Sequence, residues 1–304
     1  MDLETSGGAS APPNFMRVAD WPNYFNPNQT DECMENLRRN LPLGIPQWMP
    51  SSEVRQGKGI IVGGGPSLAG ELETLRALIE PGDRIIALND ATNYLIENGI
   101  QPWGTVFLEV AAWHPDFMAK PKPGIKYLLA SICHYSTFER LKGADIEMWH
   151  PKLDWDEAED LIASYYPRAP MVWGGHTAGL RAISLLMAMG YLDIHLFGMD
   201  SCVGVDGDFD GDETTVKTHA YGNRPDGPGH FILEIWSGGR KFYGYGRMAK
   251  QAEDFRRFCE VWHEDIPQLK IKTYGDGLLQ HMHRTRWFRF YFDEMKEFKD
   301  GEHQ

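Results

Sequence analysis

Short apolar runs alternate with amphipathic segments between Lys58 and Thr273, and this alternation constrains the fold more than any other feature. Runs rich in Val, Ile and Leu predict buried strands, and the segments between them repeat apolar residues at helical spacing. The predicted strands are 58–63, 83–88, 103–109, 125–130, 145–149, 193–198 and 269–273. The predicted helices are 68–79, 91–98, 155–165, 177–189, 247–263 and 284–298. Such alternation predicts an α/β fold with a mostly parallel, doubly wound sheet that is covered on both faces.

The first predicted strand runs into three consecutive glycines, which a proline and a helix follow. Gly63, Gly64 and Gly65 let the chain turn tightly and let another molecule approach the backbone closely. Pro66 suits a first helical turn, because the N–H that it lacks is not needed there. The start of a helix carries unpaired N–H groups and a partial positive charge, so this loop fits a phosphate. It fits equally well a tight strand-to-helix turn that binds no ligand.

Two known phosphate-binding loops do not match this stretch. The lysine-containing P-loop fails, because no Gly-Lys-Ser/Thr follows the glycines. The dinucleotide fingerprint G-x-G-x-x-G fits Gly63 and Gly65, but Leu68 stands where its third glycine belongs.

Composition narrows the class of protein. A chain of 304 residues with 42% hydrophobic residues and ten tryptophans predicts a globular protein with a large core. It has no apolar run near the ~18 residues of a membrane span, and its N-terminus lacks a signal pattern. The four cysteines are far apart with no C-x-x-C pair, which favours reduced thiols in a cytosolic protein.

The net charge of −13 disfavours non-specific binding of nucleic acid over the whole surface. The basic stretch from His281 to Arg289 could still contribute a local groove. The alternative is a solvated helix face above an aromatic stripe.

The chain divides into three expected parts. Residues 1–57 predict a disordered tail and an irregular arm, in which Thr30 caps a short helix through Asn40. Residues 58–280 form the expected nucleotide-binding domain. Within it, residues 201–246 are rich in Gly, Asp and aromatic residues and predict an inserted lid. Residues 281–304 predict a C-terminal helix.

Unusual polar residues follow the predicted strands at the points where these strands end. They are Gly63–Ser67, Asn89 with Asp90, Glu109, Asp200 and Asp276. The helix that opens at Gly174-Gly175-His176-Thr177 faces the same edge of the sheet. Each feature alone could be a cap or a turn, but ligands of such sheets bind at the carboxyl ends of the strands. Together these residues predict a nucleotide-sized site.

Several motifs in this chain occur in the same order in a known family. They are Gly63–Leu68, Ala87–Asn89, Asn98–Pro102, Thr177–Gly179, Gly190-Tyr191 and His195–Asp200. Over residues 58 to 280 they resemble the Rossmann-like family of motility-associated-factor glycosyltransferases and archaeal 6-hydroxymethylpterin diphosphokinases, which also holds bacteriophage proteins. They are similar as well to bacterial sialyltransferases that use a CMP-sugar without an essential metal. The resemblance implies a Rossmann-like fold, nucleotide binding, and transfer of either a sugar or a pyrophosphoryl group.

Site residues follow from the resemblance position by position. The implied nucleotide-binding residues are Gly63, Gly64, Gly65, Pro66, Ser67, Asn89, Asp90, Thr177, Ala178, Gly179 and Tyr221. Gly64 replaces the Asn of the sialyltransferase loop G-N-G-P-S-L, so only backbone contacts carry over there. Ala178 lacks the hydroxyl of the serine in the T-S-G motif of the sialyltransferases. Ser201 stands in the region where those enzymes have a tyrosine that binds the donor phosphate. These departures disfavour a CMP-sialic acid donor.

Two residues are expected to serve catalysis. Asp200, which follows the G-x-D strand, would bind the ribose or orient the donor. His219 lies in Thr218-His219-Ala220-Tyr221, which resembles an element of the bacteriophage relatives. A histidine can deprotonate an acceptor hydroxyl, or bind a phosphate when it is protonated. The alternative for His219 is a structural role, in which its ring forms a hydrogen bond with a loop carbonyl. His230 is a second candidate for the base, although a structural role in a loop suits it better.

Some of the remaining charged residues are candidate ligands for a metal or a phosphate. The acidic stretch 206–213 fails as an EF-hand, because Lys217 stands where the bidentate Glu belongs. Asp208 and Asp210 form a D-x-D that could hold a metal, although a solvated hairpin tip has the same pattern. His281 and His283 point in different directions on a helix and do not form a metal pair. Three cations could clamp phosphates: Arg181, which is the best placed, Arg240 and Lys241.

These observations predict a glycosyltransferase that uses a nucleotide-sugar donor and does not need magnesium. One rival is an ATP-dependent pyrophosphokinase, in which Glu109 and the 206–212 loop would hold magnesium. Another rival is a nucleotide-binding module without catalysis. The donor, the acceptor and the formation of a homo-oligomer stay open.

Overall fold

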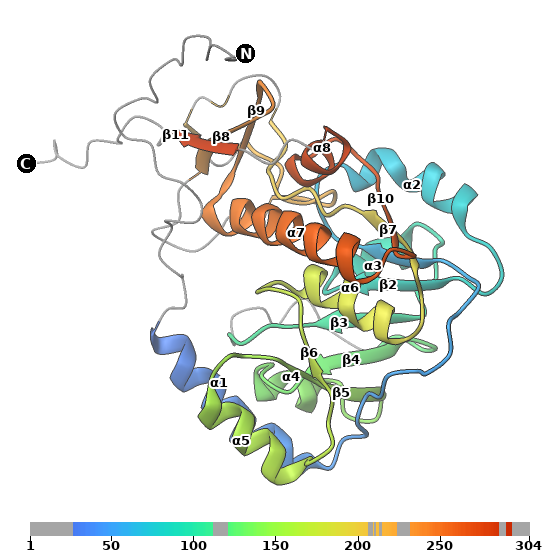
Figure 1. Cartoon of the computed structure of the whole chain (residues 1–304), viewed down its shortest axis with the longest axis vertical. Helices are drawn as coiled ribbons and strands as arrows, with labels where there is room; N and C mark the ends of the chain where they lie inside the picture. The colour runs from blue at the N-terminus through green and yellow to red at the C-terminus, as the bar shows by residue number, and fades with distance from the viewer. Residues whose placement is uncertain are drawn as a thin grey trace, which may run out of the picture.

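Eight parallel strands form the central sheet of this protein. The computed structural model describes residues 27–111, 121–205, 209, 211–212, 215–223, 232–285 and 290–293. The strand order is β10-β7-β1-β2-β3-β4-β5-β6 (Figure 1). Every neighbouring pair in this sheet runs parallel. The predicted α/β class with a parallel, helix-covered sheet is therefore confirmed.

The strands of this sheet are β1 (Gly59–Val62), β2 (Arg84–Leu88), β3 (Gly104–Phe107), β4 (Lys126–Ala130), β5 (Asp145–Pro151), β6 (Met171–Val172), β7 (Asp193–Phe197) and β10 (Lys270–Thr273). The α-helices are α1 (Pro27–Asn40), α2 (Leu68–Leu78), α3 (Ala91–Glu97), α4 (Tyr135–Arg140), α5 (Asp156–Tyr165), α6 (Ala178–Ala188), α7 (Gly246–Asp265) and α8 (Leu278–Thr285), and η2 (Leu41–Leu43) is a short 3₁₀ helix. None of the described helices is long and apolar enough to cross a membrane.

The strand order reverses beside β1. From β1 to β6 the chain adds each strand on the same side, and α6 then leads it back to β7 on the other side of β1. In parallel sheets the crevice for a ligand lies at such a reversal, outside the carboxyl ends of the strands. The fold therefore predicts a site at the ends of β1, β2 and β7.

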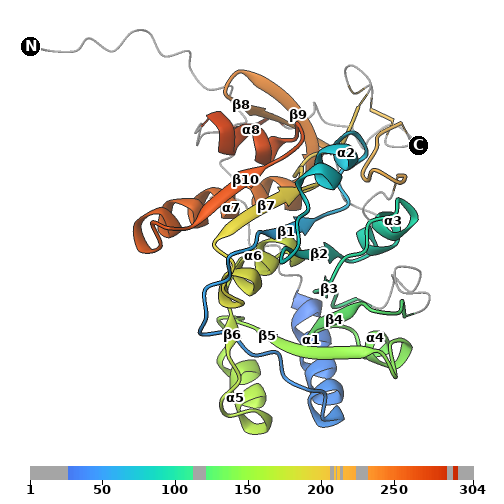
Figure 2. The ribbon, with the colours of Figure 1, turned by 90° about the vertical axis from the view of Figure 1, so that its right-hand side faces the viewer.

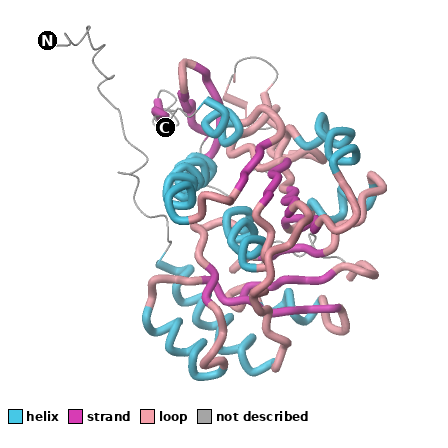
Figure 3. The backbone as a smooth tube through the Cα atoms, turned by 45° about the vertical axis from the view of Figure 1, so that its right-hand side comes forward, coloured by secondary structure: helices cyan, strands magenta, loops and turns pink. Residues whose placement is uncertain are grey.

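Two layers of helices bury the sheet (Figures 2 and 3). Side chains of β1 alternate between its faces: Ile60 and Val62 pack with Leu68 and Leu72 of α2. Ile61 belongs instead to the core that contains α6. This alternation follows from the two-residue period of a strand and explains why β1 is apolar throughout.

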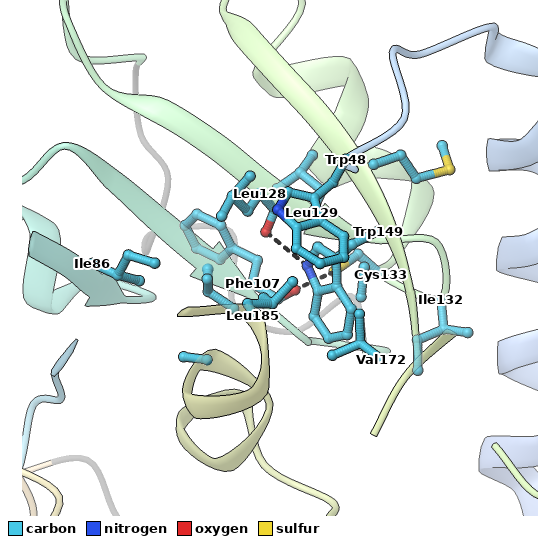
Figure 4. Packing of buried hydrophobic residues seen from close by; sticks show 14 of the residues in the cluster. Trp48, Ile86, Phe107, Leu128, Leu129, Ile132, Cys133, Trp149, Val172 and Leu185 are labelled. Atoms are coloured by element: carbon cyan, nitrogen blue, oxygen red, sulfur yellow. Dashed lines mark hydrogen bonds between the residues drawn. The ribbon is translucent and has the colours of Figure 1, made fainter. Parts of the chain in front are cut away.

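Helix α1 is part of the core at the other end of the sheet. The Asn40 side chain donates hydrogen bonds to the carbonyls of Ser131 (2.9 Å) and Cys133 (2.6 Å), which follow β4. In the same region the Trp149 indole donates to the Leu128 carbonyl at 3.1 Å (Figure 4). The predicted helix that ends at Asn40 is present, but the predicted cap at Thr30 is wrong, because the helix begins at Pro27 and Thr30 lies inside it.

The predicted helix 284–298 is wrong. Helix α8 ends at Thr285, and residues Phe290–Asp293 form strand β11, which pairs with β8 (Ile232–Ser237). The buried residues Leu278, Leu279 and Met282 have helical spacing, so the helix lies earlier in the chain than predicted. The aromatic run that follows them has the alternating pattern of a strand. With β9 (Arg240–Tyr245), β8 and β11 form a small antiparallel sheet, whose β8–β9 hairpin falls in the expected insertion and was not predicted.

Candidate functional site

The glycine loop after β1 lies against the end of β7. The Gly63 N–H donates to the Phe197 carbonyl and the Gly65 N–H donates to the Gly198 carbonyl, each at 2.8 Å. A side chain at Gly63 would place its Cβ 2.5 Å from the Gly198 oxygen. Glycine is therefore needed at Gly63 for contact between two backbones, whether or not a ligand binds.

Asp200 holds the loop from the other side. Its carboxylate accepts hydrogen bonds from the Ser67 N–H (2.7 Å), the Ser67 hydroxyl (2.6 Å) and the Gln280 amide (2.8 Å). The residue is only 3% exposed, and this burial raises the pKa of its carboxyl, while the bonds from Ser67 act in the opposite direction. A Cβ at Gly65 would lie 2.6 Å from the carboxylate. Asp200 thus contacts protein donors at the start of α2.

Most hydrogen-bond donors at the N-terminus of α2 are in use, although the Ala69 N–H makes no hydrogen bond among the described residues. The Ser67 N–H binds Asp200, the Leu68 N–H donates to the Gly65 carbonyl at 3.1 Å, and the Gly70 N–H donates to the Ser67 carbonyl at 3.1 Å. Pro66 has no N–H. A phosphate at this helix start would meet a buried carboxylate and few open donors.

The N-terminus of α6 is different. Thr177 caps it, since its hydroxyl accepts the Leu180 N–H at 3.4 Å. Within the described ranges, the N–H groups of Ala178 and Gly179 make no hydrogen bond, and the first turn holds no acidic residue. Unpaired N–H groups at a helix start attract an anion. This helix start is therefore a candidate anion site.

Gly179 brings that helix start to the crevice. A Cβ at Gly179 would lie 2.7 Å from the terminal methyl of Met199 and 3.1 Å from Leu88. Leu88 is the last residue of β2, and Met199 is the second residue after β7. The first turn of α6 consequently packs beside the carboxyl ends of β2 and β7, next to the glycine loop.

Asn89, directly after β2, has a strained backbone and an unsatisfied side chain. Its φ is 48°, in the left-handed region that non-glycine residues rarely adopt. Its Oδ1 atom is buried and has no hydrogen-bond partner in the described part of the chain. Buried polar atoms are nearly always paired, and strained residues gather at functional sites. The Asn89 amide is therefore a candidate ligand contact.

Residues 215–223, which we term the lid loop, cover the glycine loop. The Ala220 N–H donates to the Gly64 carbonyl at 2.9 Å, and the Tyr221 hydroxyl donates to the Asp90 carboxylate at 2.8 Å. A Cβ at Gly64 would collide with the Tyr221 hydroxyl and would lie 2.8 Å from Cδ2 of His219. The structure therefore brings together His219, Tyr221, Asp90 and the glycine loop, which lie far apart in the sequence.

His219 is half-buried in this lid loop. Its Nδ1 lies 2.9 Å from the Thr218 hydroxyl, and its ring lies 5.2 Å from that of Tyr221 between centroids. The Thr218 hydroxyl can donate to Nδ1 or accept from it, so it can select either neutral tautomer of the imidazole.

Of the candidate metal ligands Glu109, Asp208 and Asp210, only Glu109 lies within the described residues. Glu109 follows β3; burial raises the pKa of its carboxyl, which accepts the Ala111 N–H at 3.4 Å. Asp208, Asp210 and His230 lie outside the described residues. Among the residues that are described, no group of three His, Cys, Asp or Glu side chains could hold a metal ion.

The predicted phosphate clamp at Arg181 is wrong. The Arg181 guanidinium is 8% exposed and donates to the carbonyls of Gly175 (2.7 Å), Lys152 (2.8 Å) and Val172. Burial lowers its pKa to about 10. Because its donors bind backbone carbonyls, Arg181 holds the loop before α6. Arg240 forms a two-pronged pair with the Asp276 carboxylate.

Two residues of the site were missed from the sequence. Gln280 is fully buried and binds Asp200, and Gly198 supplies the carbonyl for Gly65. The apolar spacing of Leu278, Leu279 and Met282 could have placed a helix around Gln280. Nothing local in the sequence indicates the partner of a buried glutamine.

A cavity of about 400 Å³ lies elsewhere, between α7, β10 and α8. Its lining includes Phe255, Cys259, Trp262 and Ile271, and none of the predicted site residues. The predicted site residues at the strand ends therefore lie apart from this cavity.

Gly64→Ala tests whether the lid loop rests on the glycine loop. The added methyl should displace Tyr221 and His219, so the Ala220 amide should exchange its hydrogen faster in hydrogen–deuterium exchange. Gly70→Ala is the matched control, because a Cβ there meets nothing within 4 Å. Gly70→Ala should raise the free energy of unfolding by about 0.5–1 kcal/mol and leave hydrogen exchange at the Ala220 amide unchanged. Unchanged exchange at Ala220 in Gly64→Ala would contradict the contact.

Comparisons with known proteins agree with this architecture. No curated protein matches the chain. Among solved structures, it is similar to the MAf glycosyltransferase from Magnetospirillum magneticum AMB-1, with a TM-score of 0.57 and 19% identity over 82% of this chain. The chain corresponds to only 36% of that protein, and at this identity the likeness shows the fold alone. Residues 32–206, which contain the glycine loop and Asp200, match the profile described as 6-hydroxymethylpterin diphosphokinase MptE-like, so the chain belongs to this MptE-like family.

Proposed function

We propose that this protein is a glycosyltransferase that uses a nucleotide-sugar donor, with the donor phosphate at the N-terminus of α6. The observation that carries the proposal is that the N–H groups of Ala178 and Gly179, beside the strand reversal, make no hydrogen bond among the described residues. A transferase of this kind must stabilise the negative charge that its leaving phosphate gains. Fixed N–H groups at a helix start do so without reorganisation.

Charge favours α6 over α2 for this task. Both helices have their N-termini at the same edge of the sheet, and each carries a partial positive charge. At α2 the Asp200 carboxylate already accepts the Ser67 N–H. At α6 the first turn holds no carboxylate. A phosphate is therefore attracted to α6 and repelled from α2.

The nucleoside would lie on the glycine loop and on the end of β2. The Gly64 N–H makes no hydrogen bond among the described residues, and the Asn89 Oδ1 atom is buried without a partner there. Both suit the polar edge of a base or ribose. Asp200 would act as a positioning residue that fixes the loop, because its carboxylate is buried and bound to Ser67 and Gln280.

His219 is the proposed general base. The acceptor hydroxyl gives its proton to Nε2 while its oxygen bonds to the anomeric carbon of the donor. The bond from that carbon to the phosphate oxygen breaks, and the phosphate leaves with the electron pair. For this role Nδ1 must carry the ring proton and donate it to the Thr218 hydroxyl, 2.9 Å away. The lid loop would exclude water from the donor.

A carboxylate placed at the start of α6 tests the phosphate site. Ala178→Asp should weaken nucleotide binding at least tenfold, because like charges about 4 Å apart repel by a few kcal/mol near a protein surface. The same change should leave stability unchanged or raise it, since an acidic residue suits a helix N-terminus. Ala178→Asn is the neutral control of similar size. Binding is measured by thermal shift with CMP-, UDP- and GDP-sugars and ATP; equal binding by the Asp and Asn variants would contradict the site.

Replacement of the proposed base separates catalysis from binding. His219→Ala should lower turnover by about 10²–10⁴-fold and change donor affinity much less. Thr218→Val should lower turnover in part, because it removes the group that selects the Nδ1–H tautomer. Turnover is followed by release of the nucleotide from the sugar donor that gives the largest thermal shift. A loss of donor affinity as large as the loss of turnover would make His219 a phosphate ligand instead.

The family description favours one rival, transfer of a pyrophosphoryl group from ATP to a pterin. Transfer from ATP concentrates charge on adjacent phosphates and recruits magnesium. Nucleotide binding by the proposed glycosyltransferase should persist in excess EDTA, as checked by the same thermal shift. Binding that is lost in EDTA and restored by magnesium would favour the pyrophosphokinase.

A further inference from the structure

His176 is a titratable residue beside the start of α6 that the proposed reaction does not use. It directly precedes Thr177, the cap residue of that helix. Its Nδ1 lies 2.9 Å from one oxygen of the Asp254 carboxylate, and its Nε2 lies 3.4 Å from the Arg247 carbonyl oxygen. Asp254 and Arg247 both belong to α7. The ring therefore connects the loop before α6 to α7.

Both partners of the His176 ring are hydrogen-bond acceptors. A carbonyl oxygen and an ionised carboxylate can only accept, and a neutral imidazole has one N–H, whereas the protonated ring has two. Burial raises the pKa of the Asp254 carboxyl, but hydrogen bonds from His176 and Lys250 outweigh burial and lower this pKa below its usual value. The carboxylate is therefore ionised at neutral pH. Only the protonated ring can donate to both partners, and the neutral ring loses one of the two bonds.

Charged groups reach this ring from both helices. From α7 come the Asp254 carboxylate, the Lys250 ammonium, which pairs with the other oxygen of that carboxylate, and Arg247. From α6, the buried Arg181 guanidinium donates to the carbonyl of the residue before the histidine. The three cations favour the neutral ring, and the carboxylate favours the protonated ring. Among these four side chains, the Asp254 carboxylate is the one that bonds the ring.

The loop before α6 has little room to absorb a movement of this ring. Gly175 has a φ of 70°, in the region that favours glycine. A Cβ there would lie 2.8 Å from the Leu180 side chain of α6 and 3.2 Å from the Asp254 carboxylate. The loop is thus packed between α6 and α7, and one peptide unit separates His176 from Thr177. A shift of the ring consequently moves the start of α6.

We propose that His176 is a positioning residue for the donor phosphate, and that its protonated ring fixes the start of α6 against α7. This inference rests on the proposed function, because it takes the N–H groups of Ala178 and Gly179 as the phosphate ligands. The protonated ring also adds a positive charge two residues before Ala178, and the Cα atoms of two such residues lie at most about 7 Å apart. A cation so near the helix start favours the binding of an anion there.

The charge of the ring should therefore set the affinity for the donor. As the pH rises and the ring loses its proton, one hydrogen bond and one positive charge are lost beside the helix start. Donor affinity should fall by about tenfold between about pH 5.5 and 8.5, which spans the range in which histidines change charge. A nucleotide-sugar is a suitable probe, because it lacks the terminal phosphate proton that titrates in this range.

Calorimetry at constant ionic strength measures this dependence with the nucleotide-sugar that gives the largest thermal shift. In His176→Gln the dependence should be lost, since the amide carries no charge at any of these pH values. His281→Gln is the matched control and should keep the dependence, because the His281 ring binds the Ser237 carbonyl of β8, in the small antiparallel sheet. His219→Ala should keep it too. A dependence that is lost in His219→Ala and kept in His176→Gln would overturn the proposal.

Histidine NMR of the wild-type chain keeps the test independent of whether a variant folds. The ring nitrogen resonances of His176 are assigned through its backbone amide. Because coupling between two binding events is reciprocal, the bound donor should stabilise the protonated ring. The His176 resonances should then report protonation at a higher pH in the complex than in the free chain, and those of His281 should not change. Protonation of His176 at the same or a lower pH in the complex would overturn the proposal.

Failure of the proposed function gives a different result. A chain that binds a nucleotide-sugar with an affinity independent of pH would overturn the role of His176 and leave the donor site in place. A chain that binds no nucleotide at any pH would overturn both.

Discussion

The buried carboxylate of Asp200 fixes the conformation on which the candidate site depends. It joins three parts of the chain that are distant in sequence: the loop after β1, the end of β7 and helix α8. Three donors compensate the cost of burying its charge. Gly65 leaves room for this carboxylate, and Gly277 leaves room for the backbone of Asp200. These glycines therefore shape the loop around a carboxylate of the protein itself.

This arrangement changes the interpretation of a glycine-rich strand–helix turn. Such a turn usually suggests a phosphate at the N-terminus of the helix that follows. Here the Ser67 N–H at that position is bound to Asp200, whereas at α6, on the other face of the sheet, the N–H groups of Ala178 and Gly179 make no hydrogen bond among the described residues. We therefore propose that the glycine loop approaches the nucleoside and that α6 binds the phosphate. The loop before α2 and the N-terminus of α6 would then contact different parts of the same ligand.

The sequence predicted the framework well, because its signals are local. Apolar runs and helical spacing located the strands of the sheet except the two-residue β6, and strand ends located the polar rim. The failures concern contacts that the sequence pattern does not show. Arg181 resembled a phosphate ligand because its position near a helix start is visible in the sequence, whereas its hydrogen bonds to the carbonyls of Gly175, Val172 and Lys152 are not. The hairpin of β8 and β9 was missed because its residues lie in a Gly- and Asp-rich region that looks like a loop. Asp200 was predicted as a site residue from its place after a strand, but its buried bonds to Ser67 and Gln280 could only be seen in three dimensions.

Amide NMR with inorganic pyrophosphate as the probe tests the central claim most directly. A chain labelled with ¹⁵N at alanine, glycine and serine reports the amides of Ala178, Gly179 and Ser67 separately. Saturable shifts at Ala178 and Gly179, with the Ser67 amide unchanged, are the predicted result, because the Ser67 N–H stays bound to Asp200. Saturable shifts at Ser67 without any at Ala178 and Gly179 would contradict it, since the phosphate would then have displaced the Asp200 carboxylate from the start of α2.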